Sequence, residues 1–188
     1  MFTIRQAMAG LAAAVVLSLT AAPPPPVHAA EDGGTTSRGL GGDVTCRQGF
    51  IYNPQRKICV PAQSGILPDT HLAAYAYLLA EKGRYREALA TLDLMADPNT
   101  AVALNYRGYF TRKLGRVDDG ISYYLQAVAI DPAYPQVREY LGEAYVATGR
   151  LDLARQQLQT IEALCGTSCE YYVDLAEAIA AAGEPPLE

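Results

Sequence analysis

Apolar residues recur at helical intervals through the larger, second part of the chain. From residue 69 to residue 182 they stand three or four positions apart, as in Leu72, Tyr75 and Leu79 near the start and Leu141 and Tyr145 further on. This spacing places them on one face of an α-helix. Several such runs follow one another with short polar turns between them, and this pattern predicts helices that pack in pairs.

Three Gly-Arg turns divide the helical region into units of similar length. Gly83, Gly115 and Gly149 are 32 and 34 residues apart. Glycine ends a helix readily because it tolerates the left-handed conformation of a tight C-terminal cap. Pro98 and Pro132 cannot continue the helices before them and favour breaks near the ends of the first two units. The pattern predicts three helical hairpins, at about 69–100, 101–134 and 135–168.

Small and large residues recur at fixed offsets within these units. A small residue stands seven positions before each Gly-Arg turn and another stands five positions after the glycine: Ala76, Gly108 and Gly142, then Ala88, Gly120 and Ala154. We expect the small residues after the turn to keep the second helix close to the first. Larger residues later in each unit, Leu92, Tyr124 and Leu158, are expected to fill the space between neighbouring hairpins.

This arrangement resembles the tetratricopeptide repeat. The second unit carries the family pattern at Leu104, Gly108, Gly115, Gly120, Tyr124, Ala127 and Pro132, and the third at Leu141, Gly142, Tyr145, Gly149, Ala154 and Leu158. Arg138 stands where the family has an apolar residue, Gly166 replaces the expected proline, and the first unit is two residues short. The resemblance implies an all-α fold, a right-handed superhelix of three hairpins over residues 69–183. Residues 169–183, with an apolar helix face from Tyr172 to Ala182, are predicted to cap the last hairpin.

The resemblance also implies a binding surface. In this family the first helix of each hairpin lines a concave groove, and the groove-facing positions fall on Tyr77, Glu81, Asn105, Tyr109, Arg112, Lys113, Glu139, Glu143 and Val146. These residues do not reproduce the basic clamp with which some members hold a C-terminal carboxylate. Tyrosine offers apolar contact and a hydrogen bond at low entropic cost. We therefore expect a module that binds a protein or peptide partner and performs no catalysis.

The N-terminal residues have the layout of a signal peptide. Arg5 precedes an apolar run from Ala7 to Ala22, and four prolines separate this run from the small-x-small motif Val27-His28-Ala29. The run is shorter than the ~20 residues of a membrane-spanning helix. We expect residues 1–29 to be removed on export to the periplasm, with full secretion as the alternative. No stable membrane insertion is expected afterwards. Residues 30–43, rich in Gly, Ser and Thr, are predicted to form a flexible leader.

Two of the four cysteines bracket a short segment before the repeats. Residues 50–52 and 57–58 can form strands around a turn that starts at Asn53-Pro54. We predict a hairpin at 44–62 closed by a Cys46–Cys59 disulfide, because exported proteins favour oxidation. The hairpin could cover the first repeat or could itself recognise a ligand, such as an envelope glycan.

The other two cysteines, Cys165 and Cys169, are separated by Gly-Thr-Ser. In an exported protein a disulfide that holds the cap in place is the leading interpretation. Two alternatives stay open, a thiol-dependent copper carrier and a redox protein, although no methionine or histidine lies near the pair to assist a metal. A zinc site needs four suitably spaced ligands, and the four cysteines do not have that spacing.

Catalytic and nucleic-acid functions find little support in the composition. Apart from His28 in the predicted signal peptide the chain has one histidine, His71, which we expect to be a solvated residue at a helix start, and no nucleophile motif accompanies it. No glycine-rich phosphate loop suggests a cofactor. The formal net charge is −5 at pH 7, and no basic cluster could follow a phosphate backbone.

Overall fold

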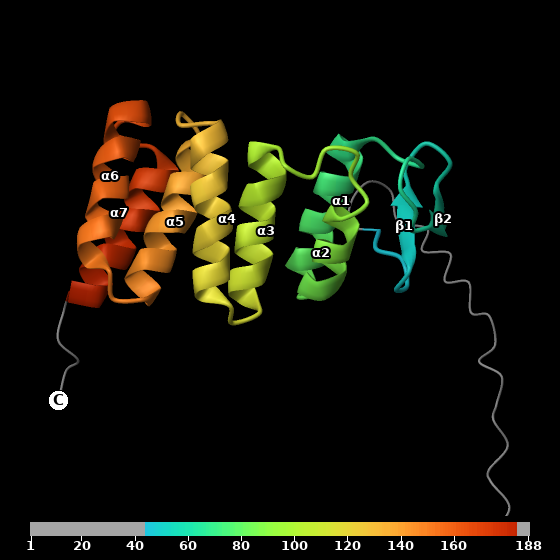
Figure 1. The fold of residues 1–188 in the computed structure, drawn as a ribbon, viewed down its shortest axis with the longest axis horizontal. Coiled ribbons are helices and arrows are strands. Elements are labelled where there is room, and N and C mark those ends of the chain that lie inside the picture. Colours follow the sequence, from blue (N-terminus) through green and yellow to red (C-terminus); the bar gives the residue numbers. More distant parts are fainter. Residues whose placement is uncertain (1–43, 184–188) are drawn as a thin grey trace, which may run out of the picture. The chain divides into compact units, whose positions relative to one another are not determined.

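The computed structural model describes residues 44–183. Within these residues an antiparallel hairpin precedes seven helices (Figure 1). The elements are β1 (Phe50–Asn53), β2 (Ile58–Pro61), α1 (Asp69–Glu81), α2 (Tyr85–Leu92), α3 (Ala101–Lys113), α4 (Val117–Ile130), α5 (Pro135–Ala147), α6 (Leu151–Cys165) and α7 (Glu170–Gly183). The predicted signal peptide and leader lie outside the described residues. No helix within 44–183 is long and apolar enough to cross a membrane.

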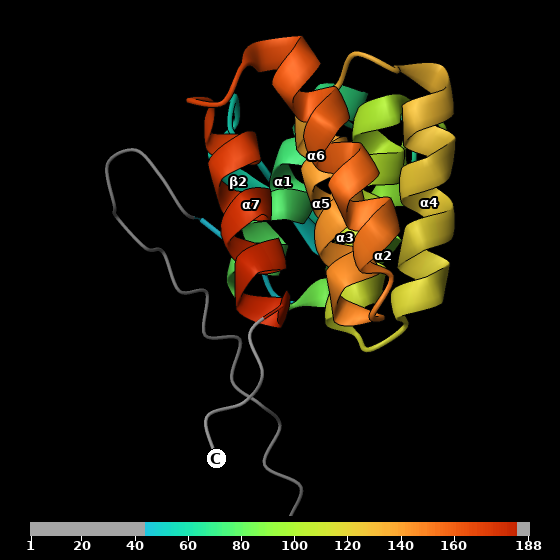
Figure 2. The same cartoon turned by 90° about the vertical axis from the view of Figure 1, so that its left-hand side faces the viewer.

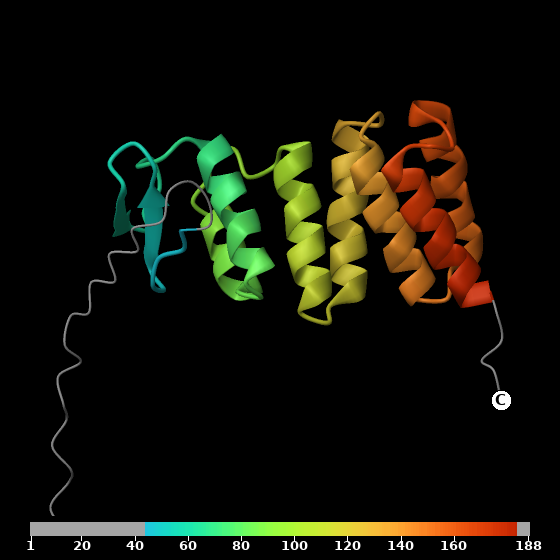
Figure 3. The ribbon, with the colours of Figure 1, turned by 180° about the vertical axis from the view of Figure 1, so that it is seen from behind.

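The helices form the three predicted hairpins, α1 with α2, α3 with α4 and α5 with α6, stacked in chain order (Figures 1 and 3). The predicted turn glycines have positive φ angles, 72° at Gly83, 85° at Gly115 and 73° at Gly149. Any other residue would be strained there, because a Cβ clashes with the backbone in this region. The all-α repeat fold is therefore confirmed.

Close contacts between helices explain the small residues seven positions before two of the turns. A Cβ on Gly108 of α3 would lie 2.4 Å from the ring of Tyr124 in α4, and a Cβ on Gly142 of α5 would lie 2.4 Å from the side chain of Leu175 in α7. Tyr124 and Leu175 are both fully buried. Each glycine therefore provides the space into which a large side chain packs.

The core consists of two clusters of buried side chains. One lies among the hairpin, α1, α2 and α3, and the other lies among α3 to α7. Tyr109 of α3 packs against both clusters. α7 lies against α5 and α6 (Figure 2) and buries Leu175 and Ile179, so it covers the last hairpin as expected of a capping helix.

Two departures from the family pattern have visible structural solutions. The short first unit has a short second helix: α2 has 8 residues, whereas α4 has 14. The carboxylate of Asp69 accepts hydrogen bonds from the backbone N–H groups of Ala96 and Asp97 and so holds the irregular segment after α2. Arg138, at the usually apolar position, lies along the surface and donates to the carbonyl oxygen of Pro132 at 2.7 Å. Neither departure disrupts the stacking.

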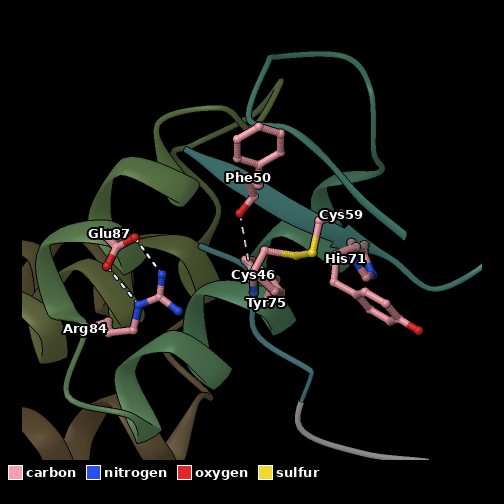
Figure 4. The surroundings of a disulfide bond; sticks show 8 residues. Cys46, Phe50, Cys59, His71, Tyr75, Arg84 and Glu87 are labelled. Carbon is pink, nitrogen blue, oxygen red and sulfur yellow. Dashed lines mark hydrogen bonds and ion pairs between the residues drawn. A yellow bond between two sulfur atoms is a disulfide. The ribbon is translucent and has the colours of Figure 1, made fainter. Parts of the chain in front are cut away.

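The N-terminal hairpin is closed by the predicted Cys46–Cys59 disulfide and docks on α1 (Figure 4). The backbone N–H of Cys46 donates to the hydroxyl of Tyr75 at 2.7 Å. Ile51 and Val60 belong to the same buried cluster as Tyr75. The hairpin is thus part of the folded unit and covers the first repeat.

His71 does not behave as predicted. It is half-buried, and its Nε2 lies 2.7 Å from the carbonyl oxygen of Tyr52 in β1. The expectation of a solvated histidine was wrong because it considered the first repeat without the strand that covers it. His71 therefore helps to hold the hairpin against α1.

The second predicted disulfide, Cys165–Cys169, links the end of α6 to the start of α7. Gly166 follows α6 with a φ of 83°, which lets the chain reverse between the two cysteines. No free cysteine occurs among residues 44–183.

Candidate functional site

The candidate site is the set of side chains on the first helices of the three hairpins, α1, α3 and α5, which we call the first-helix face. Its predicted members differ in exposure. Tyr77, Glu81 and Lys113 are exposed, and Tyr109, Arg112, Glu143 and Val146 are half-buried. Asn105 is fully buried and Glu139 is 5% exposed, so these two do not offer the open contact surface that the family pattern implied.

Aromatic rings run along this face from α1 to α5 in a series that we call the tyrosine array. Ring centroids are 5.5 Å apart for Tyr77 and Tyr106, 5.8 Å for Tyr106 and Phe110, 5.7 Å for Phe110 and Tyr109, and 5.3 Å for Tyr109 and Tyr140. These are the separations of favourable aromatic pairs. Phe110 in the middle of the array is fully buried, whereas Tyr77 is exposed and the other tyrosines are half-buried, so the array is partly core and partly surface.

Two members of the array, Tyr106 and Tyr140, were missed in the sequence interpretation. They occupy the same position in successive repeats, 34 residues apart. This equivalence was visible in the sequence. It was overlooked because the family assigns the groove to other positions, whereas here bulky rings at this position reach the neighbouring helix.

Charged side chains lie beside the array. The guanidinium of Arg112 donates to Glu143 at 2.6 Å and lies 5.9 Å from the ring centroid of Tyr140. The ammonium of Lys113 lies 5.4 Å from the ring centroid of Tyr109. These contacts hold the two cations over aromatic faces, where the ring quadrupole attracts them. Tyr109, Arg112 and Lys113 thus lie together on α3, and the ion pair of Arg112 with Glu143 joins them to α5.

Glu139 is the most perturbed acid on this face. Burial, the negative charges of Glu143 and Asp174, and a smaller one from Glu170 raise its pKa to about 8, while Arg112 opposes this shift. A buried carboxylate resists ionisation because it loses hydration that its neighbours do not replace. Burial likewise raises the pKa of Tyr140 and of Tyr124 above the usual tyrosine range. The end of the face near α7 thus combines one buried acid, Glu139, with the exposed acids Glu170 and Asp174.

Asn105 stands one repeat before Glu139, at the equivalent position. Its side-chain amide donates weakly to the hydroxyl of Tyr134 at 3.4 Å and to Gln136 at 3.5 Å. Its carbonyl oxygen, Oδ1, has no hydrogen-bond partner in the described structure. Two successive repeats therefore bury an oxygen acceptor at the same position.

A separate pocket of about 310 Å³ lies between the N-terminal hairpin and α2. Its lining is mostly apolar and includes Phe50, Ile51, Leu79 and Leu94, with Arg86 and Glu87 adding polar groups. Glu87 is held by a two-point ion pair with Arg84 (Figure 4). Recognition of a ligand by the hairpin stays a prediction.

The histidine and the cysteines of residues 44–183 make structural contacts. No three His, Cys, Asp or Glu side chains within residues 44–183 are placed to hold a metal ion. His71 contacts a backbone carbonyl oxygen and no nucleophile. Because Cys165 and Cys169 are bonded to each other, a thiol carrier would first need reduction of this disulfide.

Comparison with known proteins agrees with the architecture. Residues 112–164 match the family model described as tetratricopeptide repeat. No curated protein sequence matches the chain. The segment 112–164 therefore matches tetratricopeptide repeats in sequence, and the helical part of the chain has the tetratricopeptide repeat fold.

Several solved structures share the fold. The first tetratricopeptide domain of Spaghetti (RPAP3), bound to the HSP90 peptide SRMEEVD, has a TM-score of 0.54 and 21% identity over 62% of this chain and 94% of its own. The Yersinia enterocolitica type III secretion chaperone SycD, in complex with a peptide of the translocator YopD, has a TM-score of 0.54 and 19% identity over 63% and 96% of the two chains. The Thermus thermophilus protein TTC0263 has a TM-score of 0.51 and 25% identity over 60% and 62%.

Proposed function

We propose that the protein is an exported, non-catalytic interaction module that binds an extended segment of a protein partner along its first-helix face. The observation that carries this proposal is the tyrosine array. It continues across α1, α3 and α5, and part of it is open to solvent: Tyr77 is 38% exposed. Tyrosine-rich, rigid surfaces bind peptides without a large loss of side-chain entropy.

Structures that share the fold support a peptide-binding function. Two of the structures that share the fold carry bound peptides, one from HSP90 and one from YopD. The partner of the present chain is then a protein or peptide segment, whose identity the fold does not specify. No cofactor and no nucleic acid is part of the proposal.

Export is the second part of the proposal. Two disulfides lie within residues 44–183, and such bonds persist in oxidising compartments such as the periplasm or the extracellular space. The predicted signal peptide agrees with this location. The measurement that tests it is the N-terminal sequence of the protein isolated from the cells that produce it, which is expected to begin after residue 29.

Site-specific photocrosslinking tests the binding face. A photoreactive phenylalanine derivative at Tyr77 is expected to crosslink a partner, whereas the same group at Leu125 of α4, which is 47% exposed, is not. Equal crosslinking at both positions, or crosslinking at position 125 alone, would refute the assignment of the first-helix face. A charge reversal supports the same test: Lys113→Glu should weaken partner binding, and Arg155→Glu, at an exposed position of α6, should not.

A further inference from the structure

The pocket between the N-terminal hairpin and α2 is separate from the predicted groove, because none of the predicted groove residues lines it. Its volume is about 310 Å³. The buried side chains of Ile51 and Leu79 and the half-buried side chains of Phe50 and Leu94 supply most of its apolar lining. Phe50 comes from β1 and Glu87 from α2 (Figure 4), so the pocket exists only because the hairpin docks beside the first repeat.

The polar side chains of the lining differ in whether they have partners. The carboxylate of Glu87 accepts two hydrogen bonds from the guanidinium of Arg84, both at 2.8 Å. The hydroxyl of Thr91 donates to the backbone carbonyl oxygen of Glu87 at 2.9 Å. Arg86 also lines the pocket, is exposed, and pairs with no carboxylate within residues 44–183. The pocket therefore combines an apolar interior with an uncompensated guanidinium.

A second guanidinium lies at the apolar wall. The Cζ atom of Arg47 is 4.4 Å from the ring centroid of Phe50, and no carboxylate in the described part of the chain pairs with Arg47. Arg47, Arg84 and Arg86 thus carry three positive charges at this pocket, whereas Glu87 is the one acid in its lining. The whole chain has a formal charge of −5, so the pocket is a locally cationic site on an acidic protein. Such a site favours an anionic ligand.

We propose that this pocket binds a small organic acid whose apolar body ends in a carboxylate. The volume of 310 Å³ accommodates about ten non-hydrogen atoms at ~30 Å³ each. The apolar body would contact Phe50, Ile51 and Leu79, and the carboxylate would pair with Arg86 at the exposed side of the pocket. A guanidinium presents two parallel N–H groups to a carboxylate, which favours this pairing over a single hydrogen bond. The proposal does not depend on peptide binding at the first-helix face.

The lining favours this class of ligand over two others. A glycan needs many hydrogen-bond partners, and the only lining side chains whose polar groups lack a partner within residues 44–183 are Gln48 and Arg86. An inorganic anion such as phosphate would satisfy Arg86 but would leave the apolar part of the pocket filled with water. An apolar acid matches both parts of the lining.

Titrations followed by amide nuclear magnetic resonance spectra provide the test, with octanoate and its neutral analogue 1-octanol as the probes. The purified parent protein should bind octanoate at least about fivefold more tightly than octanol. Shift changes should concentrate in residues 48–51 and 86–94. Arg86→Gln should remove the preference for octanoate and leave octanol binding unchanged. Arg155→Gln, at an exposed position of α6, should keep the preference.

A second pair of variants tests the apolar part of the pocket. Ala90 lines the pocket and is exposed on α2, so Ala90→Phe places a ring at its opening and should weaken the binding of both probes by at least about tenfold. The control is Ala180→Phe, which adds the same ring at an exposed position of α7 and should leave both affinities unchanged. Circular dichroism checks that every variant keeps the parent helicity.

Each alternative outcome contradicts a stated part of the proposal. Equal affinity of the parent for octanoate and octanol, or an unchanged preference in Arg86→Gln, overturns the recognition of a carboxylate. Absence of saturable binding, or tight binding retained by Ala90→Phe, overturns the pocket as a ligand site. Tighter binding of a peptide that ends in leucine, with the same dependence on Arg86, would assign the pocket to a protein C-terminus and overturn the small acid. The crosslinking test of the first-helix face is independent of all these results.

Discussion

Replacing Glu139 by glutamine should change how the stability of the protein depends on pH. Glutamine has nearly the same shape and cannot ionise. Burial and neighbouring acids raise the pKa of Glu139 from 4.5 to about 8 in the folded protein. The unfolded chain, in contrast, exposes this group to water and releases its proton at the ordinary pKa. Folding of the parent protein is therefore linked to proton uptake between these two values, and folding of the variant is not.

The sign and the size of the effect follow from this linkage. The contribution of Glu139 to the free energy of unfolding is complete below pH 4.5. It is lost as the pH rises towards about 8, where the folded state also releases the proton. The loss is at most about 1.4 kcal/mol per pH unit. Between pH 5 and pH 7 it amounts to about 2.5 kcal/mol of unfolding free energy, and above pH 8 little further change is expected from this group.

Urea unfolding followed by far-ultraviolet circular dichroism at pH 5, 6, 7 and 8 measures the difference. The stability of Glu139→Gln relative to the parent should increase by about 2.5 kcal/mol from pH 5 to pH 7. A constant offset from the new amide does not affect this slope. The control Glu162→Gln, at an exposed position of α6, should run parallel to the parent. A difference between variant and parent that does not change with pH would refute the idea that Glu139 is buried without a counter-charge.

Three further substitutions test the packing and the covalent links. Gly142→Ala places a Cβ 2.4 Å from Leu175 and should destabilise the fold by about 1–3 kcal/mol, with faster amide hydrogen exchange concentrated in α7. Cys165→Ser removes the disulfide and should lower the free energy of unfolding by about 2 kcal/mol, a modest amount because the loop that the bond closes is short. An unchanged midpoint of thermal unfolding would mean that α7 stays docked without the bond. Tyr75→Phe removes the hydroxyl that accepts a hydrogen bond from the N-terminal hairpin and should cost about 1 kcal/mol; exchange in residues 44–62 that matches the parent would argue against this anchoring role.

The repeat architecture was accessible from the sequence because it depends on local rules. Gly83, Gly115 and Gly149 are needed wherever a helix ends in the left-handed conformation, and their spacing alone predicts the three hairpins. The disulfide partners followed from their closeness in sequence and the expected compartment. The family resemblance also placed Tyr77 and Tyr109 on the first-helix face.

Other features depend on contacts between residues far apart in the chain. The role of His71 requires the strand that covers it, and the burial of Asn105 and Glu139 requires the neighbouring helices to be in place. A helical pattern shows which side chains share a face, but it does not show how closely the next element covers that face. The sequence by itself therefore determined the hairpins, their turns and their order. Only the tertiary structure decided that Glu139 is buried and which rings join into an array, because desolvation and ring stacking arise from packing between helices.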